Sequence, residues 1–495
     1  MAASLWAGTV RGPLVVNDRW PQCTDLNSWT RDVMRIEGLT QASDTAQAKA
    51  FFRWLRLFSR MATGGMIQAY EGEWGREQYV LDAHKNLFVY GWGYCDTTSR
   101  IAEAAWTQFK QDRDAAERVC VMHDNGGYHT MFRLRLDGRW GAFDPRYGYY
   151  LVDRDAPDAA IVDWDQVGRR IVINRGYQHR SRPFFEFFGL EWERALLLKP
   201  VYFRNEEAWI AAGKPAESVF GNRQYQVGTR YHDMDFELPP HTTIERFWDN
   251  TARKFYVPGG VHTQKEEAFL PSGRFYRITE SMLDGNWPQH DPNHILARNE
   301  LATVPTNEGY NSRVAGGRTI GQSWGRITSD AALEAGRTFD FYSPYVLVDG
   351  SLNSARPLEV RVLKAKPQHA GQPDVWGEWR KLMPRAGVIA LDSISGLYRL
   401  QIRGSAGPIK LTLHFENGIM TLPRLFDGDN RIQVKLRDAS QLATRIHVTY
   451  RYATAGGEQR HEQVLARADF QGNTAAYRIR VTGLVRNLSV AIRAE

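Results

Sequence analysis

The chain has 495 residues, of which 43% are hydrophobic, 24% are charged and only three are cysteine. This length exceeds one ordinary hydrophobic core and predicts two to four domains, and the composition excludes extensive disorder. The formal net charge of +7 is spread along the chain with both signs interleaved, so it does not indicate nucleic-acid binding. The odd, low cysteine count argues against a disulfide framework, although one Cys23–Cys120 bridge stays open.

The N-terminal region shows no targeting segment. Its apolar run is short, is broken by Arg11 and lacks a basic start, and no stretch of the chain is long enough to span a membrane. We expect no membrane span, and a cytoplasmic location unless a leader has been removed. Residues 1–40 are mixed in character, and we expect them to wrap the domain that follows.

Residues 43–63 give the clearest helical pattern. Asp44 and Gln47 suit a capping arrangement, and Gly64-Gly65 suits a helix stop. The apolar face consists of Ala48, Phe51, Leu55 and Phe58. We expect this face to pack in the core against the next helix.

That next helix is predicted from Asp96 to about Arg113, with Cys95 at its start. The run Asp96-Thr97-Thr98-Ser99 supplies the short polar side chains that helix starts prefer. Unpaired N–H groups and the helix dipole at this end favour a thiolate on Cys95, and they can also bind an oxyanion. The carboxylate of Asp96 opposes the thiolate.

A β-hairpin follows. Residues 128–136 and 139–144 alternate as strands, and Asp137-Gly138 between them signals a two-residue turn. Paired residue numbers then sum to 275, so Met131 faces Asp144. His129 becomes a diagonal neighbour of Asp144 on the same face, roughly 7 Å away at the backbone. A bulge would spoil this register.

Cys95, His129 and Asp144 are the three residue types that thiol-based acyl chemistry requires. Cysteine is the nucleophile, and histidine takes its proton and later returns one. The carboxylate fixes the imidazole tautomer and supports its positive charge. We therefore predict these three residues as a catalytic triad.

The ordered set of motifs resembles the transglutaminase-like fold family, whose core is similar to papain and which uses a Cys-His-Asp triad. The matching residues are Gly93-Tyr94-Cys95, His129, Gly138-Arg139-Trp140 and Asp144-Pro145, with Arg118-Val119-Cys120-Val121 as the strand before the histidine. The resemblance covers about residues 40–155. One departure is Thr130-Met131, where the family often has Ala-Trp after the histidine, and it bears on substrate contacts.

The rest of the chain is predicted to be β-rich. The fold class is α+β, a papain-like core followed by antiparallel β-sandwich domains. The predicted domains are residues 1–200, 201–330, 331–420 and 421–495. The principal strands after residue 225 are predicted at residues 226–238, 243–248, 341–348, 358–363, 397–403, 409–415, 432–436, 446–452, 476–481 and 488–492.

Three further sequence patterns contain residue types found in binding sites. Residues 287–294 contain two histidines and an aspartate, but without strand or helix periodicity a polar loop is favoured over a metal site. Asp427-Gly428-Asp429-Asn430 lacks the downstream ligands of a calcium loop. Trp376 and Trp379 suit stacking on a sugar ring, but packing at the core edge is favoured. We expect no metal and no cofactor.

Two functions remain open. The first is a thiol-dependent acyl-transfer enzyme that acts on amide bonds of a protein or peptide substrate, as an amidase, protease or transglutaminase. The second is a catalytically silent scaffold whose β-domains bind a protein or glycan partner. The presence of Cys95, His129 and Asp144 favours the enzyme. More than half of the chain lies outside the resemblance, so the scaffold function remains an alternative.

Overall fold

The computed structural model describes residues 8–61, 70–71, 78–80, 82–93, 95–122, 128–145, 149–152, 160–162, 172–173, 199–202, 232–248, 313–314, 317–318, 322–333, 336–365, 375–391 and 394–495. These residues combine a few helices near the N-terminus with sheets that are almost all antiparallel, so the coarse prediction of a mixed fold that becomes β-rich is confirmed. No helix in the described ranges has the length and apolar character needed to cross a membrane.

The helices of the N-terminal part are α1, α2, α3 and the π-helix η1, which span Leu26–Ile36, Asp44–Phe58, Cys95–Lys110 and Lys85–Tyr90. Short 3-10 helices lie at Ile419–Thr421, Ala439–Gln441 and Arg467–Asp469. Helix α1 was missed, although Leu26, Trp29 and Val33 recur at helical spacing and are buried. Its N-cap is Asp25, which accepts a hydrogen bond of 2.7 Å from the N–H of Ser28.

Helix α2 differs from its prediction at both ends. Its N-cap is Ser43, not Asp44. It ends at Phe58, before Gly64-Gly65, because the chain becomes extended at Ser59 and enters strand β3 (Arg60–Met61). Strand β3 pairs in parallel with β6 (Trp92–Gly93), immediately before α3.

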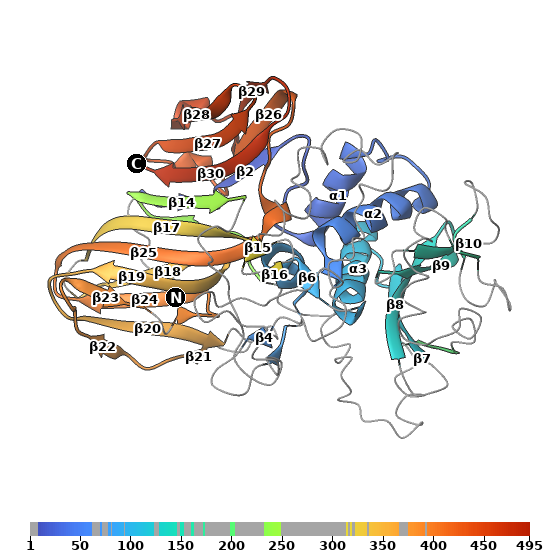
Figure 1. Ribbon diagram of the computed structural model, residues 1–495, viewed down its shortest axis with the longest axis horizontal. Coiled ribbons are helices and arrows are strands. Elements are labelled where there is room, and N and C mark those ends of the chain that lie inside the picture. Colours follow the sequence, from blue (N-terminus) through green and yellow to red (C-terminus); the bar gives the residue numbers. More distant parts are fainter. Residues whose placement is uncertain are drawn as a thin grey trace.

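Helix α2 packs against the third helix, as predicted: the rings of Phe51 and Trp106 lie 5.3 Å apart between centroids. Its other side meets a six-stranded sheet. The ring of Phe52 lies 6.0 Å from that of Phe132 and 5.2 Å from that of Phe143. The helices thus cover one face of this sheet, and they lie between it and the β-rich part of the molecule (Figure 1).

The six-stranded sheet has the order β11-β10-β9-β8-β7-β12. Its central hairpin follows the predicted register, because Leu136 pairs with Arg139 and Phe132 with Phe143. No register shift interrupts β8 where it pairs with β7. The strands β7 to β12 are Ala116–Met122, Tyr128–Leu136, Arg139–Asp144, Tyr149–Val152, Val172–Ile173 and Lys199–Tyr202.

The turn of this hairpin also holds helix α2. Asp137 and Gly138 both have positive φ, 48° and 85°, as an Asp-Gly hairpin turn requires. The carboxylate of Asp137 accepts hydrogen bonds from the N–H of Asp44 at 3.1 Å and from the Thr45 hydroxyl at 2.9 Å. A helix start therefore obtains a capping carboxylate from far along the chain, which no local pattern indicates.

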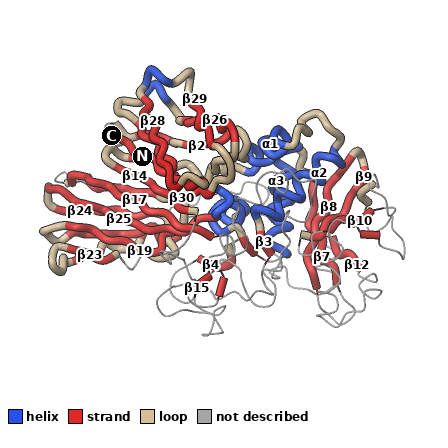
Figure 2. The backbone as a smooth tube through the Cα atoms, turned by 45° about the horizontal axis from the view of Figure 1, so that its top comes forward, coloured by secondary structure: helices blue, strands red, loops and turns tan. Residues whose placement is uncertain are grey.

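The largest sheet has eight strands in the order β23-β19-β25-β17-β14-β30-β27-β28. A five-stranded sheet of β18, β24, β20, β21 and β22 lies beside its β19–β25 half, and a three-stranded sheet of β2, β26 and β29 lies beside its β27–β30 half (Figures 1 and 2). The eight strands are Val388–Ala390, Val346–Asn353, Gly407–Gly418, Gln322–Leu333, Thr242–Phe247, Arg486–Ala494, Ile446–Thr454 and Gly457–Leu465. The other eight are Thr338–Tyr342, Arg399–Gly404, Leu358–Ala365, Val375–Trp376, Arg380–Leu382, Leu14–Asn17, Gly428–Lys435 and Thr474–Val481.

Most of the predicted strands match observed strands within a few residues. The strand predicted at 341–348 is two strands, β18 and β19, because the chain turns through Ser343 and Pro344 into a different sheet. Strands β2, β17, β21, β22, β23 and β28 were not predicted. In the described part of the strand predicted at 226–238, only the short β13 (Glu237–Leu238) is a strand, and it pairs with β1 (Val10–Arg11).

The N-terminal segment joins the two halves of the molecule. Strand β2 pairs with β26, which lies more than 400 residues later. The Trp20 indole N–H then donates a 2.7 Å hydrogen bond to the carbonyl of Met420, while its ring stacks on Phe58 of α2. The expectation that residues 1–40 wrap the first domain therefore missed their main role. The predicted domain boundaries stay a prediction, and the eight-stranded sheet takes strands from all three segments after residue 200.

Candidate active site

Cys95 is the first residue of α3, as predicted, and its side chain is partly exposed. The first N–H groups of a helix have no partner within the helix, so an anion at this position is favoured. Neither Cys95 nor Cys23 forms a disulfide, which removes the Cys23–Cys120 bridge. The side chain of Cys120 lies outside the described residues, so its predicted burial stays a prediction.

One hydrogen bond joins the start of α3 to the hairpin. Ser99, one turn after Cys95, donates its hydroxyl to the backbone carbonyl of Thr130 at 3.4 Å. Residues four apart lie on the same face of a helix, so Cys95 and Ser99 share a face. The first turn of α3 is therefore seated beside Thr130, the residue after His129.

The register explains why this carbonyl is available. The N–H of Arg135 donates to Ala115 on the β7 side, so odd-numbered residues of β8 bond toward β7 and even-numbered residues toward β9. Continuing the β8–β9 register by one more hydrogen-bonded pair places Pro145 opposite Thr130. Proline has no N–H to donate. The Ser99 hydroxyl takes the place of the missing backbone donor at the point where β9 ends.

The backbones of the other two predicted site residues, His129 and Asp144, are near this contact. Asp144 is the last residue of β9 and is fully buried. By strand alternation its side chain leaves the sheet on the face opposite Phe143, which packs against α2. His129 lies in β8, and its backbone pairs with that of Val121 in β7. The side chain of His129 is outside the described part of the structure, so its hydrogen bond to Asp144 stays a prediction.

A buried charge cluster surrounds the start of α3. Asp96 accepts hydrogen bonds from Arg100 at 2.9 Å and from Arg118 at 3.1 Å. Arg118 also donates to Glu103 at 2.6 Å. All four side chains are buried, and the two carboxylates balance the two guanidiniums. The sequence analysis identified Asp96 as a negative charge beside the thiol, but it did not predict the two arginines that pair with it.

Arg118 is the centre of this cluster. Burial disfavours its charge, but Glu103 and Asp96 outweigh burial and raise the pKa of Arg118 above its usual value. It therefore stays a cation and neutralises the region around Cys95. In the sequence, Arg118 was identified only as part of a predicted strand. Its position on the buried face of that strand could have indicated that it pairs with a buried carboxylate.

Thr130 is a further polar residue near the start of α3. Its hydroxyl is buried and has no hydrogen-bond partner among the described residues. A buried hydroxyl without a partner costs free energy, on the order of 1–3 kcal/mol. Sequence reasoning did not predict that Thr130 would contact the start of α3.

The other patterns do not form sites among the described residues. Residues 287–294 lie outside them, and within them no group of His, Cys, Asp and Glu is arranged to hold a metal. The carboxylate of Asp427 accepts a 2.7 Å hydrogen bond from the N–H of Gly483, and Asn430 is buried, so the turn at 427–430 makes internal contacts.

Trp376 and Trp379 stack on arginines. The guanidinium of Arg361 lies 4.9 Å from the ring centroid of Trp376 and 4.6 Å from that of Trp379. Arg403 lies 4.1 Å from the Trp379 centroid. Ring faces that the sequence analysis considered for a sugar are thus in contact with cations.

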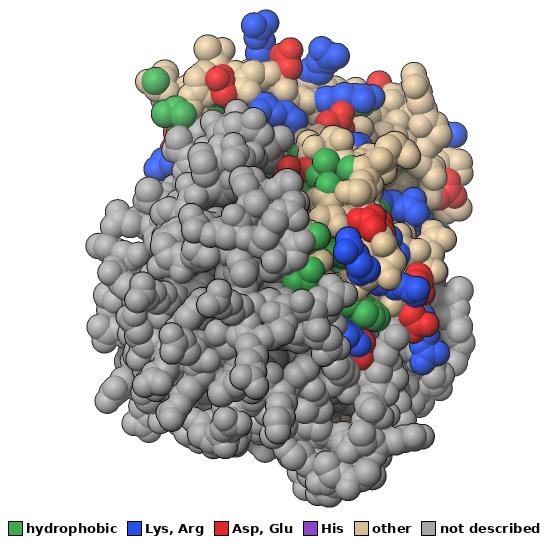
Figure 3. Space-filling view, turned by 90° about the vertical axis from the view of Figure 1, so that its right-hand side faces the viewer, with side chains coloured by type: hydrophobic (Ala, Val, Ile, Leu, Met, Phe, Trp, Pro, Cys, Tyr) green, Lys and Arg blue, Asp and Glu red, His purple; other side chains and the backbone are tan. Residues whose placement is uncertain are grey.

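On the face shown in Figure 3, positive and negative side chains of the described residues are interspersed, and neither sign gathers into a patch on that described part. Comparison with known proteins gives no relative: no protein-family model, no curated protein and no solved structure matches the chain.

Proposed function

We propose that the chain is a thiol-dependent acyl-transfer enzyme with a transglutaminase-like, papain-like core and Cys95, His129 and Asp144 as its triad. The observation that carries the proposal is the Ser99–Thr130 hydrogen bond. It joins the helix that begins at Cys95 to Thr130, which follows His129 in β8 and, by register, lies opposite the residue after Asp144. By strand alternation His129 and Asp144 share the other face of the sheet, so the approach of the Cys95 side chain to them is part of the proposal.

The reaction follows from these roles. The Cys95 thiolate attacks the carbonyl carbon of an amide, and the N–H groups at the start of α3 stabilise the negative oxygen. The C–N bond breaks, and His129 gives its proton to the leaving amine. A thioester remains on Cys95. Water or a second amine then attacks the thioester while His129 takes its proton, which gives a carboxylic acid or a new amide and restores the thiol.

The charge cluster supports this chemistry by position. Arg118 and Arg100 neutralise Asp96, the residue adjacent to the nucleophile. A neighbouring carboxylate that is already paired opposes the thiolate less than one that is unpaired. Asp144 is fully buried, as the orienting carboxylate of a triad commonly is.

The experiment is labelling with a thiol-reactive acyl probe built on a peptide amide, with the modified residue identified by peptide mass spectrometry. We expect an adduct on Cys95 in the native protein and in Cys23→Ala, and none at that position in Cys95→Ala. Asp144→Asn is nearly isosteric and should slow labelling strongly, because asparagine favours the wrong imidazole tautomer.

The second candidate is a silent scaffold that binds a protein or glycan through its β-sheets. It rests on the extent of the β-rich part, which includes the largest sheet of the described structure. If Cys95 labels at the same rate in His129→Ala and Asp144→Asn as in the native protein, the triad is not acting and the scaffold becomes the better account.

A further inference from the structure

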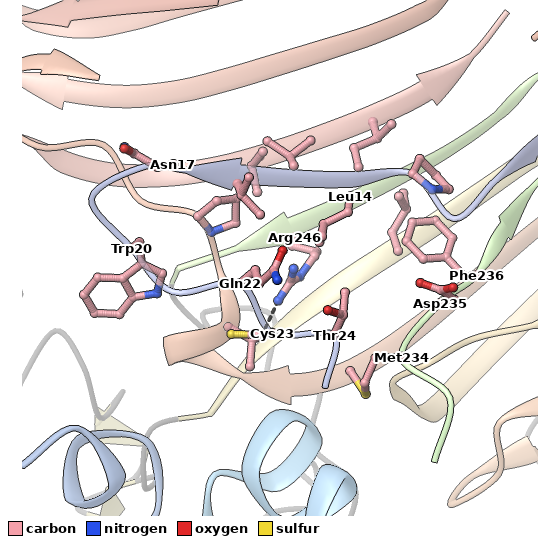
Figure 4. Close-up of a pocket in the computed structure, with 18 of the residues that line it drawn as sticks. Leu14, Asn17, Trp20, Gln22, Cys23, Thr24, Met234, Asp235, Phe236 and Arg246 are labelled. Carbon is pink, nitrogen blue, oxygen red and sulfur yellow. Dashed lines mark hydrogen bonds between the residues drawn. The ribbon is translucent and has the colours of Figure 1, made fainter. Parts of the chain in front are cut away.

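A second site lies away from Cys95, where the N-terminal segment crosses the β-rich part. A cavity of about 50 Å³ is enclosed by residues 13–24, residues 234–236 and strands β14 and β30 (Figure 4). This volume holds a few water-sized groups. Arg246, on β14, points toward Gln22, Cys23 and Thr24 across it (Figure 4).

Arg246 has only neutral partners. Its Nε donates to the side-chain oxygen of Asn417 at 3.3 Å, and one Nη donates to the hydroxyl of Thr421. Its guanidinium lies 4.6 Å from the ring centroid of Tyr345. Among the described residues no carboxylate is within ion-pair distance of it. A guanidinium has five N–H donors, so most of the donors of Arg246 have no partner among the residues that the structure describes.

The nearby carboxylates are already engaged. Asp235 lines the cavity but accepts a 2.8 Å hydrogen bond from Arg437. Asp32 accepts from the backbone N–H of Gln22 and from Arg35. Arg246 is therefore a lining cation whose charge no described carboxylate balances.

The remaining walls are mixed. Their apolar part consists of Leu14, Met234, Phe236, Ile244, Val490 and Ile492, and their polar part includes Gln22, Thr24 and Thr421. A site with one unbalanced guanidinium and an apolar stretch of wall suits a molecule with one negative charge and a short hydrocarbon tail. Inorganic phosphate matches less well, since it carries more charge and no apolar part.

We propose that this cavity is a binding site for a small monocarboxylate with a short alkyl tail, whose carboxylate pairs with Arg246. The guanidinium fork suits the two carboxylate oxygens, and the tail replaces water against the apolar wall. The site is separate from the proposed triad and does not depend on it.

Cys23 serves as a built-in reporter. Its sulfur lines the cavity and donates a 3.5 Å hydrogen bond to the carbonyl of Pro21. Burial raises the pKa of the Cys23 thiol well above its usual value, although Arg246 acts in the opposite direction. The thiol is therefore a slow nucleophile, and an occupant of the cavity should block its modification.

The test measures the alkylation rate of Cys23 in the full chain at about pH 9, with and without sodium butyrate. The raised pKa makes this reaction slow at either condition, so the two rates are compared over the same long reaction time. At a butyrate concentration of ten times Kd, we expect alkylation to slow about tenfold, because only the empty fraction reacts. n-Butylamine, with the same tail and the opposite charge, should give no protection. Because this measurement uses the native protein, it does not depend on the folding of a variant.

Variants assign the effect to the guanidinium. Arg246→Gln should abolish protection by butyrate, whereas Arg437→Gln, which changes the arginine bound to Asp235, should retain it. A rise in Tm with butyrate should follow the same pattern. Absence of protection in the native protein, or equal protection in Arg246→Gln, would overturn the proposal. Stronger protection by inorganic phosphate would overturn the choice of a carboxylate.

Discussion

The environments of Cys95 and Cys23 have similar ingredients and opposite expected chemistry. Both thiols are partly exposed, and each has arginine and aspartate nearby. Cys95 begins a helix, and the adjacent Asp96 is held by two arginines. Cys23 lies in an irregular segment at a cavity wall, where burial dominates over the charge of Arg246 and raises the pKa of its thiol.

The difference teaches that a cation near a cysteine is not enough to activate it. Arg246 lies close enough to favour a Cys23 thiolate, yet loss of hydration outweighs it. Cys95 is the first residue of α3 and is partly exposed, so the helix N-terminus favours its thiolate and burial opposes it less. Three tests address this contrast, and a fourth applies the same electrostatic reasoning at an exposed position.

The largest effect is expected from Arg118→Met. It leaves Asp96 without one of its two arginine partners and removes the arginine that pairs with Glu103, both in buried surroundings. Breaking a buried ion pair by removal of one partner costs about 3–5 kcal/mol of unfolding free energy. Urea denaturation measures it, with Arg451→Met as the control, since the exposed Arg451–Glu458 pair should contribute about 1 kcal/mol or less. A loss as small as in the control would mean that Arg118 does not hold the helix start.

The second test compares the two thiols directly. At about pH 6, Cys95 should react with iodoacetamide at least about tenfold faster than Cys23, because a helix N-terminus favours the thiolate and burial disfavours it. Peptide mass spectrometry reads each cysteine separately. His129→Ala should slow Cys95 and leave Cys23 unchanged. Equal rates at the two cysteines would contradict the activated-thiol interpretation.

The third test addresses the contact that seats α3. Ser99→Ala removes the hydroxyl that meets the Thr130 carbonyl, and we expect a loss of about 1 kcal/mol, since the bond is long at 3.4 Å. The acyl-probe labelling rate of Cys95 should also fall, whereas the alkylation of Cys23 should not. Ser99→Thr keeps the hydroxyl and should retain labelling. Unchanged labelling in Ser99→Ala would separate helix position from the reactivity of Cys95.

The sequence predicted what depends on neighbours along the chain. The hairpin is the clearest case, because Asp137-Gly138 demands positive φ and thereby sets the whole register between β8 and β9. Helix α3 follows from its apolar spacing and polar start. These local rules sufficed to predict that Cys95 begins a helix and that Asp144 ends a strand.

What could not be predicted depends on partners remote in sequence. Strand β2 is too short to identify alone and exists because β26 lies beside it. The turn between β18 and β19 follows from the chain changing sheets, and apolar alternation continues across it. The pairing of Asp96 with Arg118 and the cavity around Arg246 need three-dimensional contacts across 22 and more than 200 positions.

The smallest effect is expected at the turn that caps α2, and it tests the electrostatic reasoning at an exposed position. Slight burial acts to raise the pKa of Asp137, but hydrogen bonds from the Thr45 hydroxyl and from the N–H groups of Asp44 and Thr45 outweigh it and lower this pKa. A depressed pKa in the folded state means that the charged form contributes stability above the unfolded pKa of about 3.9, and that this contribution is lost as pH falls through the folded value.

Asp137→Asn keeps the left-handed turn conformation, which asparagine tolerates, and removes only the charge. Because the carboxylate is largely solvated, we expect a loss of only a few tenths of a kcal/mol at neutral pH. Urea denaturation at about pH 7 and at about pH 3 measures it, and the difference between variant and native protein should shrink at the lower pH. A difference that stays constant between the two pH values would assign the effect to turn geometry rather than to charge at the start of α2.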